Sequence, residues 1–132
     1  MQRDMDLVRE LLLKLESLPM RPGAVVLISG NDAELAVPGH SADEIEYHLS
    51  LIREAGLVES PGSQLACGGI SFRRLTWEGH NFLDSVRDPL IWRETKEGAK
   101  KAGGFSIDLL VALATGLIKK KIEEHTGVSV DL

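Results

Sequence analysis

The sequence predicts an α+β fold in which helices pack on a small antiparallel sheet and an extra helix follows at the C-terminal end. Three observations predict it: several segments have helical apolar spacing, short β-branched runs lie between them, and a glycine-rich loop separates the last two runs. The 132 residues are 43% hydrophobic and 27% charged, which is the size and composition of one globular domain.

The first predicted elements are a helix and a strand. Asp4 can cap the free amides of a helix that Pro19 ends, and its apolar residues recur every three or four positions: Val8, Leu11, Leu12, Leu15 and Leu18. The β-branched run Ala24–Ser29 predicts a strand. Residues 33–37 fit a second short strand, although one helical turn would suit them equally well.

A helix from about residue 42 to residue 55 has the strongest local signals. Ser41 and Glu44 form a capping box at its start, and Gly56 stands where the left-handed C-cap is needed. Its inward face holds Ile45, His48, Leu49 and Ile52. Residues 57–59 and 70–75 then predict two strands joined by a loop over residues 60–69.

Three more helices are expected after this hairpin. Thr76 caps the first, whose Trp77 we expect to cover the core, and Pro89 suits the first turn of the second. Ser106 caps the last, which is apolar almost all round except at Asp108, and the lysines of residues 119–121 suit its C-terminal end. We therefore predict a domain over residues 1–102 and a C-terminal apolar helix over residues 105–124.

The order of elements resembles a winged-helix domain, in which the helix over residues 42–55 corresponds to the recognition helix. The sequence is also similar to the family called domain of unknown function 2513, found in bacteria and their phages. Segments 3–7, 44–49, 54–57 and 74–88 carry this similarity, and the motif around Trp77 is its most specific part. The resemblance implies a phage or prophage setting and no known reaction.

Two functions remain open at this stage. A DNA-binding regulator of winged-helix type would use Arg53, Arg73 and Arg74 as its nucleic-acid-binding residues. However, the outward face of the candidate recognition helix carries three carboxylates against one arginine, which would repel phosphate. The sequence therefore favours a protein-interaction or oligomerising module over DNA binding.

The candidate interaction surface has two parts. On the helix over residues 42–55 it comprises Glu46, Tyr47 and Arg53, which would dock a basic partner. On the last helix it comprises Leu110, Leu113 and Leu117, because that helix offers more apolar surface than one contact face needs. We expect this helix either to fill a groove of its own domain or to form a homo-oligomer.

Composition argues against several other classes. A single cysteine, Cys67, excludes an internal disulfide framework, and the four histidines lack metal-ligand spacing. No nucleophile–base pair stands out, so we expect no enzyme activity, no metal and no cofactor. The charged residues near the start of the chain do not fit a signal peptide and no apolar run could span a membrane, so we expect a cytoplasmic protein without membrane contact.

Overall fold

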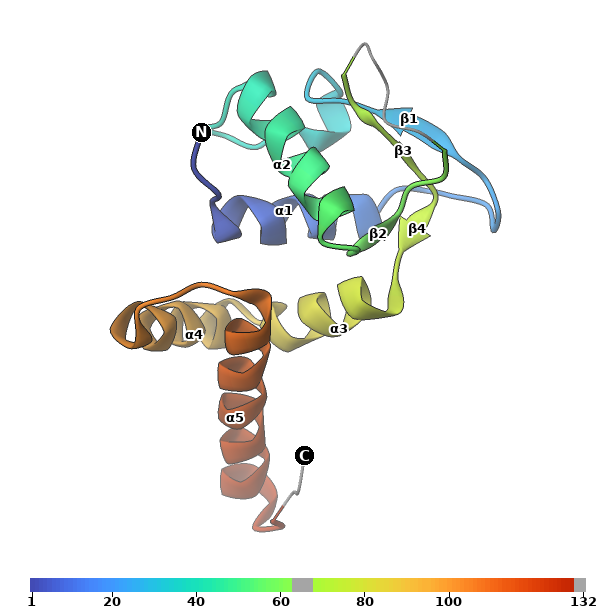
Figure 1. Cartoon of the computed structure of the whole chain (residues 1–132). Helices are drawn as coiled ribbons and strands as arrows, with labels where there is room; N and C mark the ends of the chain where they lie inside the picture. The colour runs from blue at the N-terminus through green and yellow to red at the C-terminus, as the bar shows by residue number, and fades with distance from the viewer. Residues whose placement is uncertain (63–67, 130–132) are drawn as a thin grey trace. The chain divides into compact units, whose positions relative to one another are not determined.

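The computed structural model describes residues 1–62 and 68–129 (Figure 1). They form two compact units that divide after His80. The first unit holds α1 (Met5–Glu16), β1 (Val26–Ile28), the 3-10 helix η1 (Ala33–Leu35), α2 (Ala42–Glu54), β2 (Val58–Glu59), β3 (Ile70–Phe72), β4 (Arg74–Leu75) and the start of α3 (Trp77–Val86). The second holds the rest of α3, α4 (Pro89–Ala102) and α5 (Ile107–Thr126).

The α+β fold class is confirmed. The strands form two small antiparallel pairs, in which β1 pairs with β3 and β2 pairs with β4. The single strand predicted over residues 70–75 is wrong, because Arg73 separates it into β3 and β4, and its amide donates to the Glu59 carbonyl. The two halves of this run therefore serve different strand pairs.

The core of the first unit lies between α1, α2 and the strands. The apolar face predicted for α2 is buried, as are the inward residues of β3 and of η1. The face predicted for α1 is buried except for Leu18, which is half-buried and lies beyond the end of α1 at Glu16. The fully or almost fully buried side chains here include Leu7, Leu11, Leu12, Leu15, Leu35, Ile45, His48, Leu49, Ile52, Ile70 and Phe72. Helix α2 is thus held on its inner face, and its outer face is left for contacts.

The strand expected over residues 33–37 is wrong, and the helical alternative is correct over one short turn. The Asp32 carboxylate accepts from the Ser29 amide at 2.8 Å, which closes the preceding turn. The Leu35 amide then donates to the Asp32 carbonyl, and the Leu35 side chain is fully buried. This local turn chemistry, together with one apolar anchor, outweighs the weak strand pattern.

The second unit contains the packed pair α4 and α5. Asp88 caps α4 with Pro89 in its first turn, and Gly103 ends the helix at φ 85°. Ser106 caps α5 as predicted, but α5 continues to Thr126 and ends at Gly127. Lys119–Lys121 therefore do not lie at its C-terminal end, because the residues after them continue the helix.

The two tryptophans have opposite environments. Trp92 is buried, and the Lys96 ammonium lies over its ring at 5.5 Å from the centroid, which is a cation–π contact. Trp77 is 78% exposed, so the expectation that it covers the core is wrong. It lies in the first turn of α3, where the Thr76 cap fixes the backbone without directing the ring inward.

Two further predictions concern residues that the structure describes only in part or not at all. The loop predicted over residues 60–69 lies partly outside the described residues, and Cys67 lies wholly outside them. Within residues 1–62 and 68–129, no helix is long and apolar enough to cross a membrane.

Candidate interaction surface on helix α2

Helix α2 has both of its ends fixed by local chemistry that the sequence predicted. The Ser41 hydroxyl accepts from the Glu44 amide at 3.1 Å, and the Glu44 carboxylate accepts from the Ser41 backbone in return. At the other end Gly56 has φ 73°, and the Leu57 amide donates to the Ile52 carbonyl at 3.1 Å. These caps set where the exposed face of α2 begins and ends.

His48 fixes the inner face of α2 to the start of α1. Its Nε2 accepts from the Asp4 amide at 2.8 Å, and its Nδ1 lies 2.7 Å from the Glu44 carbonyl oxygen. A neutral ring with its hydrogen on Nδ1 serves both partners, because Asp4 offers a donor and Glu44 an acceptor. His48 is therefore a structural hydrogen-bonding residue, buried to 2% exposure.

His40 lies between two carboxylates near the same helix start. Its Nδ1 is 3.0 Å from Glu44 Oε2, and its Nε2 is 3.9 Å from Asp4 Oδ2. The hydrogen bond from His40, followed by the one from the Ser41 backbone, lowers the pKa of Glu44. This carboxylate thus stays ionised and its contacts hold the start of α2.

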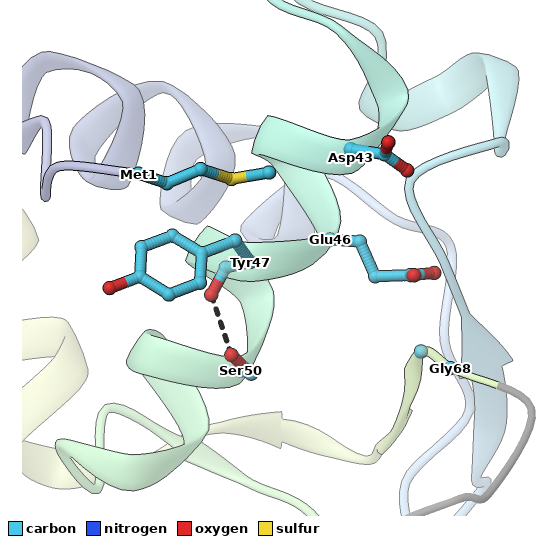
Figure 2. Close-up of a pocket in the computed structure, with 7 residues that line it drawn as sticks. Met1, Asp43, Glu46, Tyr47, Ser50 and Gly68 are labelled. Atoms are coloured by element: carbon cyan, nitrogen blue, oxygen red, sulfur yellow. Dashed lines mark hydrogen bonds between the residues drawn. The ribbon is translucent and has the colours of Figure 1, made fainter.

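The outer face of α2 borders a hollow of about 320 Å³. Figure 2 shows Asp43, Glu46, Tyr47 and Ser50 projecting from the same helix, with Glu46 and Tyr47 pointing in opposite directions. Met1 lines the hollow as well, and Gly68 and Gly69 line it from the segment that leads into β3. We call this hollow, defined by its seven lining residues, the α2 groove.

One residue that lines the groove, Gly68, lies so close to Glu46 that a side chain would not fit there. A Cβ added to Gly68 would come within 2.8 Å of Glu46 Oε2, and Gly68 has φ 86°. The carboxylate of Glu46 therefore lies against backbone that carries no side chain. Asp43 and Glu46 are the charged side chains among the lining residues, so the groove has a negative character.

Arg53 does not line the groove. Its Nε donates to Ser60 Oγ at 3.1 Å, and its Nη2 donates to the Gly62 carbonyl at 3.1 Å. Arg53 thus ties the end of α2 to the segment that follows β2. Of the interaction residues predicted on this helix, Glu46 and Tyr47 both line the groove with their side chains pointing in opposite directions, and Arg53 makes a different contact.

Arg73 and Arg74 share one carboxylate. Arg73 Nη1 lies 2.5 Å from Glu59 Oε1, and Arg74 Nε lies 2.7 Å from Glu59 Oε2. The hydrogen bonds from Arg74 and then from Arg73 lower the pKa of Glu59. Both guanidinium groups therefore already have an anionic partner, although the Arg74 side chain is 73% exposed.

The interaction residues predicted on α5 are not equally accessible. Leu110 is fully buried within the structure, so it has no surface left for a partner. Leu113 and Leu117 are half-buried, and Leu113 also packs against α4, because a Cβ on Gly98 would lie 3.5 Å from it. The accessible apolar face of α5 therefore differs from the predicted one.

Sequence reasoning missed part of the groove. Met1, Gly68 and Gly69 line it but lie outside α2, with Met1 before α1 and the two glycines in the segment that leads into β3. The signal that could have found them is the Gly68–Gly69 pair, because adjacent glycines before a strand permit close backbone approach.

His80 lies near a carboxylate of α1. Its Nδ1 is 3.8 Å from Glu16 Oε2, and Asp84, four residues after His80, accepts from Arg87 at 2.9 Å. Among the residues that the structure describes, no group of three or more His, Cys, Asp or Glu side chains could hold a metal ion.

Comparison with known proteins identifies the family. The family model described as "Hypothetical protein (DUF2513)" matches residues 2–106, so the chain belongs to this family. An "Uncharacterized protein" of Haemophilus influenzae strain Rd is 33% identical over 124 residues, which cover 92% of this chain and 99% of the relative. No solved structure matches. The family match ends at the N-cap of α5, whereas the similarity to the relative spans most of the chain.

Proposed function

We propose that this protein is a non-catalytic interaction module of winged-helix type whose α2 groove docks a basic segment of a partner protein. The observation that carries the proposal is the groove itself, which is open to solvent and lined by two carboxylates and an aromatic ring. Lysine and arginine side chains of a partner would pair with Asp43 and Glu46, and a different residue of the same segment would pack on Tyr47, whose ring points the other way.

The strand pairing supports the winged-helix part of the proposal. A hairpin of β2 with β3 and β4 follows the elements α1, β1, η1 and α2 along the chain. Strand β1 pairs with β3 of that hairpin. Helix α2 occupies the place of the recognition helix in such domains. The helix before it is here reduced to η1, three residues long.

The charges favour a protein over a nucleic acid as the partner. Residues 1–80 contain seven Lys and Arg against twelve Asp and Glu, so this unit carries the entire net charge of −5. Counterion release requires cations that can reach phosphate, and Arg53, Arg73 and Arg74 are engaged within the protein. DNA binding remains the second candidate because the Arg74 side chain is 73% exposed.

The proposed setting has two sources. The family resemblance implies a bacterial phage or prophage setting, and the sequence itself led us to expect a cytoplasmic protein, so we propose both. The same module would self-associate through α5, whose apolar surface exceeds what its contact with α4 covers.

A peptide-binding measurement tests the groove. We would titrate the full chain against a fluorescein-labelled peptide of alternating lysine and alanine and follow the fluorescence anisotropy. We expect saturable binding that weakens about tenfold or more in the double variant Asp43→Asn, Glu46→Gln. The matched control is Glu54→Gln, because Glu54 is an exposed carboxylate of α2 that does not line the groove.

The control separates a site from a general attraction. The double variant removes two charges and the control removes one. A loss of binding free energy in the double variant no greater than twice that in Glu54→Gln would therefore mean that the peptide responds only to the net negative charge, and the proposal would then fail. The proposal also fails when the wild-type protein does not bind the peptide at low ionic strength.

A further inference from the structure

Helix α5 presents one side to α4 and leaves the opposite side open. Leu110 and Ala114 are fully buried, whereas Asp108, Ala112, Gly116 and Lys120 are all exposed. The last four follow each other at four-residue spacing, so they form a line that turns by about 40° around the helix at each step and by about 120° in all. Figure 1 shows α5 as a long straight helix whose length allows such a line.

Apolar side chains flank this line. Leu109 and Leu113 are half-buried beside it, and Phe105, just before the helix, is 38% exposed. Ala112 and Gly116 carry little or no side chain, and a Cβ on Gly116 would meet no atom within 4 Å. A second helix could therefore approach the backbone of α5 closely here while it covers the flanking leucines.

The charges at the two ends of the line are complementary to each other. Asp108 stands at one end and Lys120 at the other, and within residues 1–62 and 68–129 neither forms an ion pair. They are separated by about 18 Å along the helix axis, given the rise of about 1.5 Å per residue. Residue 114 lies midway between them.

A second copy of α5 fits this pattern in one direction. In an antiparallel pair that crosses at residue 114, with the axes inclined so that the two lines run alongside each other, Asp108 of each copy faces Lys120 of the other, and Ala112 faces Gly116. In a parallel pair, Asp108 would face Asp108 and the lysines would face lysines, which is repulsive. The line is therefore self-complementary about a twofold axis, as a symmetric dimer requires.

We infer that the exposed face of α5 packs antiparallel against α5 of a second copy of this chain, with Asp108 of each copy paired to Lys120 of the other. This assigns a role to Lys120, which does not lie at the end of the helix. It rests on the self-association in the proposed function and is independent of the α2 groove.

A charge-swap experiment on the full chain tests the arrangement. Sedimentation equilibrium gives the dimer dissociation constant of the wild type, of Asp108→Lys, of Lys120→Asp and of the double variant. We expect each single variant to weaken the dimer by about tenfold or more, since each creates two like-charge contacts per dimer, and the double variant to restore it. Glu97→Lys is the matched control, because it makes the same change in charge at an exposed position of α4.

Gly116→Glu adds an independent check on the same face. The side chain meets no atom of its own chain, so the helix content seen by circular dichroism should be unchanged. The dimer should weaken, because two carboxylates would be brought into the centre of the contact.

Three results would overturn the inference in distinguishable ways. A dimer that is insensitive to the single variants refutes the antiparallel register and leaves self-association intact. A dimer that the double variant fails to restore refutes the pairing of Asp108 with Lys120. A wild-type protein that stays monomeric at all concentrations refutes both the register and the proposed self-association, whatever the α2 groove binds.

Discussion

Replacement of His48 by leucine tests how α1 and α2 are joined. The imidazole is almost fully buried, and its Nε2 is the acceptor for the Asp4 amide at 2.8 Å. Leucine has a similar volume but no acceptor, so the Asp4 amide would lose its partner at a partly buried position. His48→Gln is the matched variant, because its side-chain oxygen can accept from the Asp4 amide.

The structure sets the expected magnitude. An unsatisfied donor costs about 1–3 kcal/mol, and the Glu44 carbonyl loses a second donor as well, so we expect His48→Leu to lower the free energy of unfolding by about 2 kcal/mol. Small domains have about 5–15 kcal/mol in total, so this loss is readily measured. His48→Gln should cost about 1 kcal/mol, because it keeps the Asp4 contact and loses the one to Glu44.

Urea unfolding followed by far-UV circular dichroism measures these losses. With a slope of about 1–3 kcal/mol per molar urea, the midpoint of His48→Leu should fall by about 1 M, and that of His48→Gln by about half as much. Equal midpoints for the wild type and His48→Leu would refute the argument that His48 satisfies the start of α1. A larger loss for glutamine than for leucine would refute the assignment of Nε2 as an acceptor.

The other predictions concern two glycines and one carboxylate. Gly79→Ala should lower the free energy of unfolding by about 2 kcal/mol, because its Cβ would overlap the Leu57 carbonyl oxygen. Gly98→Ala in α4 should raise the free energy of unfolding by about 0.5–1 kcal/mol. Thermal unfolding of the two variants checks these opposite signs, and a stabilising Gly79→Ala would contradict the close approach of Gly79 to Leu57. Glu59 has a lowered pKa in the folded protein, so its contribution is present above the unfolded value and is lost as the pH falls through the folded one. Glu59→Gln should therefore show a smaller drop in unfolding midpoint between about pH 6 and pH 3 than the wild type, and an unchanged drop would contradict the role of Arg73 and Arg74.

The parts of the fold that the sequence predicted are those set by neighbouring residues. Helix α2 begins at Ser41 and ends before Gly56, because capping and left-handed C-caps depend on a few adjacent positions. Asp4, Asp88 and Ser106 cap their helices for the same reason. The signals lie within one turn of the feature that they determine.

The parts that it missed depend on residues distant in the chain. Trp77 is exposed because the hydrogen bonds of Thr76 set the backbone and not the ring. The interruption of the strand at Arg73 depends on its amide meeting Glu59, fourteen positions earlier. In the groove, Glu46 was predicted from the helix face, but its approach to Gly68 depends on the packing of β3. The spacing of residues within a single helix or strand does not indicate which distant residues it will contact.

A DNA titration at low and at physiological salt tests the central claim most directly. The claim is that the α2 face receives a basic protein and not phosphate. Fluorescence anisotropy of labelled mixed genomic fragments should show no salt-sensitive binding by the full chain under conditions in which the lysine–alanine peptide binds. Salt-sensitive DNA binding that is lost in Arg73→Ala and Arg74→Ala would contradict the account and establish the protein as a nucleic-acid binder.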